Sequence, residues 1–445
     1  MRYENIKSGI LTILVLVSIL LTWNLWTYQP NYKTMENSNY VEEVTLSEKQ
    51  EVQKIIRPDQ LLYHVKGKHF GTNNTDEIEK VIKALSGWSF FDVKKYSTEV
   101  KNLKELIHGS GNTEIKFPGE VPIELYRSVL NIEGKKVPSF NFDRIIIDVD
   151  NAAKENGVVY FVSTENEQVY ISHISSANLS EFKRNFYQKA AKYPRYFAYQ
   201  ASEKRTIFLP ENATEMTTYK YLPVTLDSEE FKEALFSDPS FVQKSSVPTG
   251  EVPTGEEFTN DSSKMTVNFE SNLLRYVNPT VEENFINTSY DLVKRSIDFV
   301  NEHGGWTDPY RYVYKNEFTH SVTFRLYSME GYPVFNGNGI SEINEVWGRD
   351  EISKYIRPNI ALELPLTTEM IKVTRPSGHD ALKFLQNKKN FKPGLLGDMI
   401  LGYRMERDAT ENKLIVLEPA WFYLYDKSWG EITLEDLGGS QHGLE

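Results

Sequence analysis

The chain has 445 residues, of which 40% are hydrophobic, and its 62 acidic and 50 basic side chains give a formal net charge of −12. This length is enough for two to four domains with buried cores, and the acidic surplus argues against a nucleic-acid partner, because few basic groups remain to neutralise phosphates. The absence of cysteine excludes disulfides, thiolate metal sites and a cysteine nucleophile.

The amino end carries an uncharged apolar segment over residues 8–32. At about 1.5 Å per residue, its centre at 9–26 is about 27 Å long as a helix, close to the hydrocarbon thickness of a bilayer. We predict a cytoplasmic tail over 1–8 and a transmembrane signal anchor over 9–27, since Arg2 and Lys7 outweigh Glu4 before the span. A cleaved signal peptide is the alternative, but it needs a shorter apolar core and a small-residue cleavage site.

Two sets of side chains distinguish the predicted span. Aromatic rings that prefer the headgroup level stand at its carboxyl end and form candidate membrane-interface anchors: Trp23, Trp26 and Tyr28. Four hydroxyl side chains fall within about a third of the helix circumference at 100° per residue: Ser8, Thr12, Ser18 and Thr22. This hydroxyl stripe could pack against another membrane helix, or the hydroxyls could simply bond to their own helix carbonyls.

The remaining chain is expected outside the membrane and begins with a polar tether over 28–46. An N-terminal α+β domain is predicted over 47–140. Apolar spacing and capping residues place three helices in it, at about 48–56, 76–86 and 98–108, and two strands at 61–65 and 88–96.

A central α+β domain is predicted over 141–266. Short apolar and alternating runs predict its strands at about 144–149, 158–163, 168–173, 196–200 and 205–209. Helical spacing predicts its helices at about 178–193 and 228–236. The tandem VPTGE within 245–259 is expected to form an exposed loop, because dense Pro and Gly do not suit a helix or a central strand.

A C-terminal α+β domain is predicted over 267–445. Helices are expected at 282–303 and 377–386, and the strands form runs before and after the second helix, at 319–328, 332–335, 340–347, 351–364, 396–405, 413–425 and 431–434. Such runs favour antiparallel sheets with helices on one face, so the predicted fold class is α+β with mainly antiparallel sheets.

Candidate chemical sites in the exported part are weak. Asp148 and Asp150 share a strand face and could hold a divalent cation, but an acidic strand end is usually a surface feature. His64 and His69 lack both the i, i+4 spacing and the acid of a metalloprotease helix. A strand with aromatic residues at 421–425 could bind a partner, although burial between a sheet and a helix is favoured. We therefore expect no catalytic residue, cofactor or metal site, and no enzyme activity.

The sequence resembles the YycH (WalH) family, whose members are accessory regulators of the WalK–WalR (YycG–YycF) two-component system of Gram-positive bacteria. Four segments carry the resemblance: ENIK at 4–7, LTWNLWTYQP at 21–30, GYPVFN at 331–336 and EPAWFY at 418–423. It covers the full length and implies a three-domain exported part whose central and C-terminal domains are akin to YycI.

The resemblance implies a membrane-anchored regulator that controls cell-wall metabolism together with YycI, through the WalK/YycG sensor histidine kinase. Contacts would run through transmembrane helices and extracytoplasmic domains, with a homodimer as a further option. Two alternatives remain open at this point. An extracytoplasmic sensor of a cell-wall or lipid ligand predicts a concave pocket, and an exported hydrolase predicts paired catalytic groups within hydrogen-bond reach.

Overall fold

The computed structural model describes Ser18 and residues 48–96, 103–150, 156–249, 252–282 and 288–433. The chain divides into two compact units, Met1–Val41 and Glu42–Glu445. The predicted tail, anchor and tether lie outside the described residues except for Ser18, which is helical and exposed. The fold below is that of the second unit.

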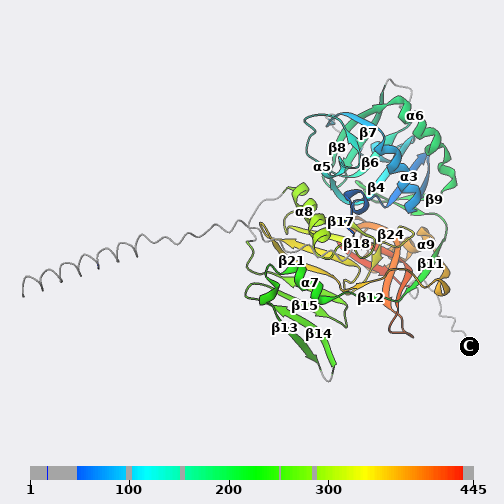
Figure 1. Ribbon diagram of the computed structural model, residues 1–445. Helices are drawn as coiled ribbons and strands as arrows, with labels where there is room; N and C mark the ends of the chain where they lie inside the picture. Colours follow the sequence, from blue (N-terminus) through cyan, green and yellow to red (C-terminus); the bar gives the residue numbers. More distant parts are fainter. Residues whose placement is uncertain are drawn as a thin grey trace, which may run out of the picture. The chain divides into compact units, whose positions relative to one another are not determined.

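The largest sheet has ten strands and contains every described strand that precedes residue 211 (Figure 1). Only its edge pair β3–β5 is parallel, and the other pairings in it are antiparallel. Its strands, in spatial order, are β10 (Arg205–Pro210), β9 (Arg195–Ser202), β2 (Lys68–Thr72), β1 (Gln60–Val65), β4 (Asn112–Pro122), β6 (Asn141–Asp148), β7 (Asn156–Ser163), β8 (Gln168–Ser175), β3 (Ser89–Lys95) and β5 (Asn131–Ile132).

An eight-stranded antiparallel sheet follows later in the chain. Its strands are β13 (Gln243–Thr249), β14 (Val252–Thr259), β15 (Lys264–Asn268), β16 (Leu273–Val277), β21 (Ile352–Pro358), β20 (Glu342–Trp347), β18 (Ser321–Leu326) and β17 (Tyr310–Asn316). A two-stranded ladder joins β12 (Val224–Thr225) to β22 (Ile360–Ala361).

The third large sheet has six strands, with β26 paired to β25 beside the main path and a parallel edge pair, β19–β24. Its strands are β19 (Val334–Phe335), β24 (Leu396–Arg407), β25 (Ile415–Tyr425), β11 (Thr214–Tyr221), β23 (Ile371–Arg375) and β26 (Ser428–Ile432). The predicted α+β class with mainly antiparallel sheets is confirmed.

Helices with one apolar face cover these sheets. In α3, Asn74 caps the first turn by accepting from the Glu77 amide, and Ile78, Val81 and Leu85 face the core. The helices are α2 (Val52–Ile55), α3 (Thr75–Ser86), α4 (Leu103–His108), α5 (Ile123–Tyr126), α6 (Ser176–Asn185), α7 (Ser228–Leu235), α8 (Ser289–Glu302) and α9 (Gly378–Asn387), with 3₁₀ turns η2 (Tyr187–Lys192), η3 (Pro239–Phe241), η4 (Thr367–Glu369) and η5 (Pro393–Leu395).

The expected boundary between residues 140 and 141 falls between two hydrogen-bonded neighbours of one sheet, β4 and β6. Strands from the predicted N-terminal and central domains therefore share one ladder. Local sequence patterns predict individual strands, but they carry no information about which strands pair across long distances. One connected hydrophobic core then runs from Ile55 in α2 to Ile432 in β26.

The expectation of an exposed loop at 245–259 is wrong, because most of this segment belongs to the β13–β14 hairpin. Figure 1 shows the hairpin in green at the end of the eight-stranded sheet. Its prolines, Pro248 and Pro253, face each other at a register shift near the turn. Proline is tolerated there, since β13 is an edge strand and a bulge needs no regular ladder bond.

Candidate functional site

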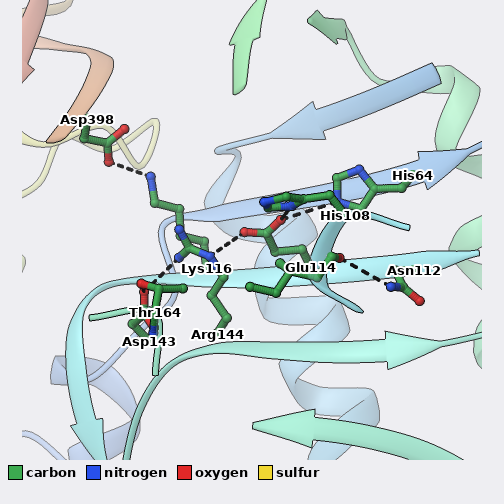
Figure 2. Close-up of polar contacts among 10 residues, drawn as sticks. His64, His108, Asn112, Glu114, Lys116, Asp143, Arg144, Thr164 and Asp398 are labelled. Carbon is green, nitrogen blue, oxygen red and sulfur yellow. Dashed lines mark hydrogen bonds and ion pairs between the residues drawn. The ribbon is translucent and has the colours of Figure 1, made fainter. Parts of the chain in front are cut away.

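The strand β4 carries a row of polar side chains through the middle of the ten-stranded sheet. Alternate residues of a strand share one face, so Asn112, Glu114 and Lys116 line up on the same side (Figure 2). Asn112 donates from Nδ2 to the Leu106 carbonyl at 2.7 Å. This bond ties β4 to the last turn of α4, which carries His108.

Glu114 is the centre of this row and is only 1% exposed. Its Oε2 lies 3.4 Å from His64 Nε2 and 3.0 Å from His108 Nδ1, and its Oε1 lies 2.7 Å from Arg144 Nε (Figure 2). Burial alone would raise the pKa of Glu114, but the Arg144 guanidinium and the two histidines hold it well below its usual range. Glu114 is therefore an ionised, buried carboxylate that contacts two imidazoles and pairs with one guanidinium.

Three histidines converge beside this carboxylate, and together with Glu114 we call them the histidine cluster: His64, His69, His108 and Glu114. His64 Nδ1 and His69 Nδ1 are 2.8 Å apart. Phe208 packs against all three imidazoles, with ring centroids 5.2, 4.9 and 4.8 Å away. Burial lowers the pKa of His64, and burial together with the neighbouring His64 lowers the pKa of His69 to about 4. These two imidazoles are thus neutral at neutral pH.

The charge of Arg144 is balanced on its other side. Asp143 Oδ2 lies 3.1 Å from Arg144 Nη1, and Asp143 also accepts from the Thr164 amide at 2.8 Å and from the Thr164 hydroxyl at 2.6 Å. Burial would lower the pKa of Arg144, but Asp143 and Glu114 raise it. The guanidinium therefore stays charged between two carboxylates.

The last residue of the row reaches a different sheet. Lys116 Nζ lies 2.6 Å from Asp398 Oδ2 of β24, and the two side chains are 16% and 24% exposed. Burial would raise the pKa of Asp398, yet Lys116 holds it below its usual value. Asp59 lies nearby, is partly buried, and accepts from the Tyr327 hydroxyl at 3.4 Å. This ion pair joins the ten-stranded sheet to the six-stranded sheet.

A small cavity lies at the same junction. It holds about 20 Å³, and its lining includes Phe208 and Tyr196 from one sheet and Met399 and Trp421 from the other. This volume fits about one water molecule, whereas sites for small organic ligands measure about 300–1,000 Å³. The cavity is therefore too small for a lipid or a cell-wall fragment.

Of the predicted site residues of the span, Ser18 is described. The others lie outside the described residues: Ser8, Thr12, Thr22, Trp23, Trp26 and Tyr28. Among the described residues, no helix combines the length and the apolar character needed to cross a membrane. The hydroxyl stripe and the aromatic anchors stay predictions.

Two other motifs are placed by the structure. Asp150 pairs with Lys183 at 3.3 Å and its amide donates to Asp148, so the D-x-D contacts protein groups. Trp421 is 1% exposed and donates to the Pro376 carbonyl at 3.0 Å, as expected for a strand covered on both faces.

Sequence patterns missed most of the cluster. His64 and His69 are directly opposite in the β1–β2 hairpin, because the two-residue turn Lys66–Gly67 has positive φ at both positions, 49° and 77°. The signal that could have found this pair is the Lys-Gly turn between two alternating runs. No local signal links them to His108 and Glu114, which come from α4 and β4.

The fold and this network define a mixed α+β protein in which buried charged groups connect neighbouring strands and, through Lys116 and Asp398, two of its sheets. Family models agree over nearly the whole chain: "YycH protein, N-terminal domain" matches residues 4–191 and "YycH protein, C-terminal domain" matches residues 204–438. The chain belongs to the YycH family. The Lys116–Asp398 pair therefore links the two regions that the models describe.

Relatives support the same assignment. The chain is 25% identical over 442 residues to the protein of Bacillus subtilis (strain 168) described as "Two-component system WalR/WalK regulatory protein YycH", covering 95% of this chain and 94% of the relative. The crystal structure of YycH from Bacillus subtilis matches with a TM-score of 0.72 and 21% identity, over 87% of this chain and 99% of that one. This structural match supports the fold.

Proposed function

We propose that this chain is a regulatory protein of a WalR/WalK-type two-component system. One observation carries the proposal: the similarity to the Bacillus subtilis regulatory protein extends over 95% of this chain and 94% of the relative. Both family models also match, so neither half has been replaced by an unrelated domain. A role in regulation rather than catalysis agrees with the description of that relative as a regulatory protein.

We further propose that the chain is anchored in the cell membrane by the helix predicted at 9–27, with its bulk outside the cell. Its partners would be the sensor histidine kinase WalK/YycG and the companion regulator YycI, as the family resemblance implies. The hydroxyl stripe would provide one contact within the membrane, because small hydroxyl residues permit close helix approach. The folded unit Glu42–Glu445 would provide the extracytoplasmic contacts.

The mechanism is a difference in contact energy between two kinase states. A regulator shifts an equilibrium only by the difference in its affinity for the two states. About 1.4 kcal/mol changes a population ratio tenfold, which two or three modest helix contacts at about 0.6 kcal/mol each would supply. The interior of the exported part needs no large ligand site for this, consistent with the single-water cavity beside Phe208.

The membrane contact is tested by replacing the hydroxyl stripe. Changing Ser8, Thr12, Ser18 and Thr22 to leucine should alter the output of promoters controlled by the kinase at unchanged protein level. The matched control changes Ile13 and Val17 to alanine, because at 100° per residue they lie opposite the stripe on the predicted helix. Unchanged output in the stripe variant, or an equal change in the control, contradicts the stripe contact.

The partnership is tested by co-purification from membranes. The full chain should retain the kinase and YycI in mild detergent, and a truncation after residue 46 should retain less of both. Failure of the full chain to retain either protein, together with normal promoter output in a deletion strain, would contradict the regulatory proposal.

A further inference from the structure

Three metal-ligating side chains meet in the histidine cluster. One ligand atom each from His64, His108 and Glu114 lies within 4.8 Å of the other two. They come from three different elements, β1, α4 and β4. The regulatory proposal makes no use of this convergence.

The distances suit a zinc ion. Zinc binds imidazole nitrogen and carboxylate oxygen at about 2.0–2.2 Å in a tetrahedron, which places neighbouring ligand atoms about 3.3 Å apart. The distance from Glu114 Oε2 to His64 Nε2 is 3.4 Å, and the distance to His108 Nδ1 is 3.0 Å. An ion could therefore enter between these atoms with small side-chain movements.

The chemistry of the donors also suits zinc. Ligation requires an ionised carboxylate and imidazoles with a free nitrogen lone pair. Glu114 is ionised beside Arg144. For His64, ligation through Nε2 requires the tautomer with the proton on Nδ1, which can donate to His69 Nδ1 at 2.8 Å when His69 carries its own proton on Nε2. For His108, ligation through Nδ1 likewise requires the tautomer with the proton on Nε2. These are changes of tautomer, so His64 stays neutral on binding the ion.

Supporting contacts surround the ligands, as is usual for metal sites. Arg144 holds the second oxygen of Glu114 at 2.7 Å, and Asp143 at 3.1 Å offsets the guanidinium charge. Phe208 covers the three imidazoles and limits the access of water. His108 is 12% exposed, so its side of the cluster provides an entry path.

We propose that His64 Nε2, His108 Nδ1 and Glu114 Oε2 form a three-ligand Zn²⁺ site, with a water molecule as the fourth ligand. Two histidines and one glutamate are an established ligand set for this ion. Binding would fasten the end of α4 to β1 and β4, so that the extracellular zinc concentration sets how firmly this helix is held.

The test uses the full-length chain, stripped with a chelator and titrated with ZnCl₂ by calorimetry. We expect one zinc per chain and a melting temperature that rises with zinc concentration. In the variant His108→Asn, the amide nitrogen can keep the hydrogen bond to Glu114 while the ring ligand is lost. Zinc affinity should then fall at least about 100-fold, the upper end of what loss of a supporting contact costs.

The matched control is His173→Asn, since His173 also lies beside a carboxylate, with its Nε2 3.7 Å from Asp92 Oδ2. The control should bind zinc like the original chain. Absence of stoichiometric binding, or equal affinity in His108→Asn, overturns the proposal. X-ray absorption at the zinc edge of the original chain gives an answer that does not depend on any variant: two imidazole ligands support the site, and a shell without imidazole overturns it.

Discussion

The ion pair between Lys116 and Asp398 gives the sharpest stability prediction, because it joins two sheets in a largely buried position. The variant Lys116→Met removes the ammonium while keeping most of the side-chain volume. It leaves Asp398 without the Lys116 cation and near Asp59, whose pKa is already raised by desolvation and by Asp398. The variant Asp398→Asn removes the charge from the other partner.

The expected magnitude follows from distance and exposure. At 2.6 Å and an effective dielectric constant of about 20, the gross attraction is about 6 kcal/mol, and desolvation cancels much of it. Loss of one partner of a buried pair costs about 3–5 kcal/mol. With exposures of 16% and 24%, we expect each single variant to lose about 2–4 kcal/mol of unfolding free energy.

The assay is urea unfolding of both single variants and the double variant, arranged as a double-mutant cycle. The coupling energy should be about 2 kcal/mol or more. The chain supplies a matched control in Lys372 and Glu215, which are 2.7 Å apart but 73% and 62% exposed. Their coupling should be at most about 1 kcal/mol. Equal coupling in the two pairs would refute the reasoning from burial.

Three further predictions concern single sites. Glu345 is fully buried, and burial raises its pKa from 4.5 to about 8, so the folded state holds this proton more firmly than the unfolded state does. Its contribution to stability should be complete below pH 4.5 and should fall by about 1.4 kcal/mol per pH unit as the pH rises toward 8. Glu345→Gln should remove this slope when unfolding is measured at several pH values. Gly119→Ala should cost about 1–3 kcal/mol in urea unfolding, because a Cβ there would lie 2.3 Å from the Val313 carbonyl oxygen, and an alanine variant as stable as the original would contradict that close approach. Asn74→Ala should cost about 1 kcal/mol through loss of the α3 cap, with a loss below about 0.3 kcal/mol speaking against the cap.

Sequence patterns predicted the amphipathic helices well. The apolar spacing of α3, α8 and α9 is local information. In α8, the residues that this spacing places on one face, Leu292, Val293 and Ile297, are buried. The exact start is less certain from the sequence. The helix was predicted from residue 76, with Thr75 before it as the natural cap, whereas α3 begins at Thr75 and Asn74 caps it, because both side chains can accept a backbone hydrogen bond.

The strand β4 shows why the candidate site was not predicted. Pro118 and Gly119 lie inside it and indicate a break in structure, but the ladder with β6 simply shifts register between Lys116 and Val121. Gly119 is needed for the close approach of β17, whose Tyr312 hydroxyl donates to the Glu120 carbonyl at 2.7 Å. The strand that carries Glu114 and Lys116 thus looks like a loop in the sequence.

The partners of Glu114 could not be predicted for a different reason. His64, His108 and Arg144 are distant from Glu114 in sequence or belong to other elements, and only strand pairing and the α4–β4 contact bring them together. A buried carboxylate held between two imidazoles and a guanidinium depends on tertiary structure, which a single sequence does not display.

The order of strands in the ten-stranded sheet also has a consequence for how the chain folds. The strand β2 pairs with β9, which lies more than a hundred residues later, through His69 opposite Tyr196. The β1–β2 hairpin therefore keeps an open edge on the β2 side until β9 has paired with it. Such non-local pairings slow folding, and an unpaired edge invites wrong strand partners in the meantime. Conditions that speed the pairing of β2 with β9 should therefore raise the yield of folded protein more than substitutions on the surface of the sheet.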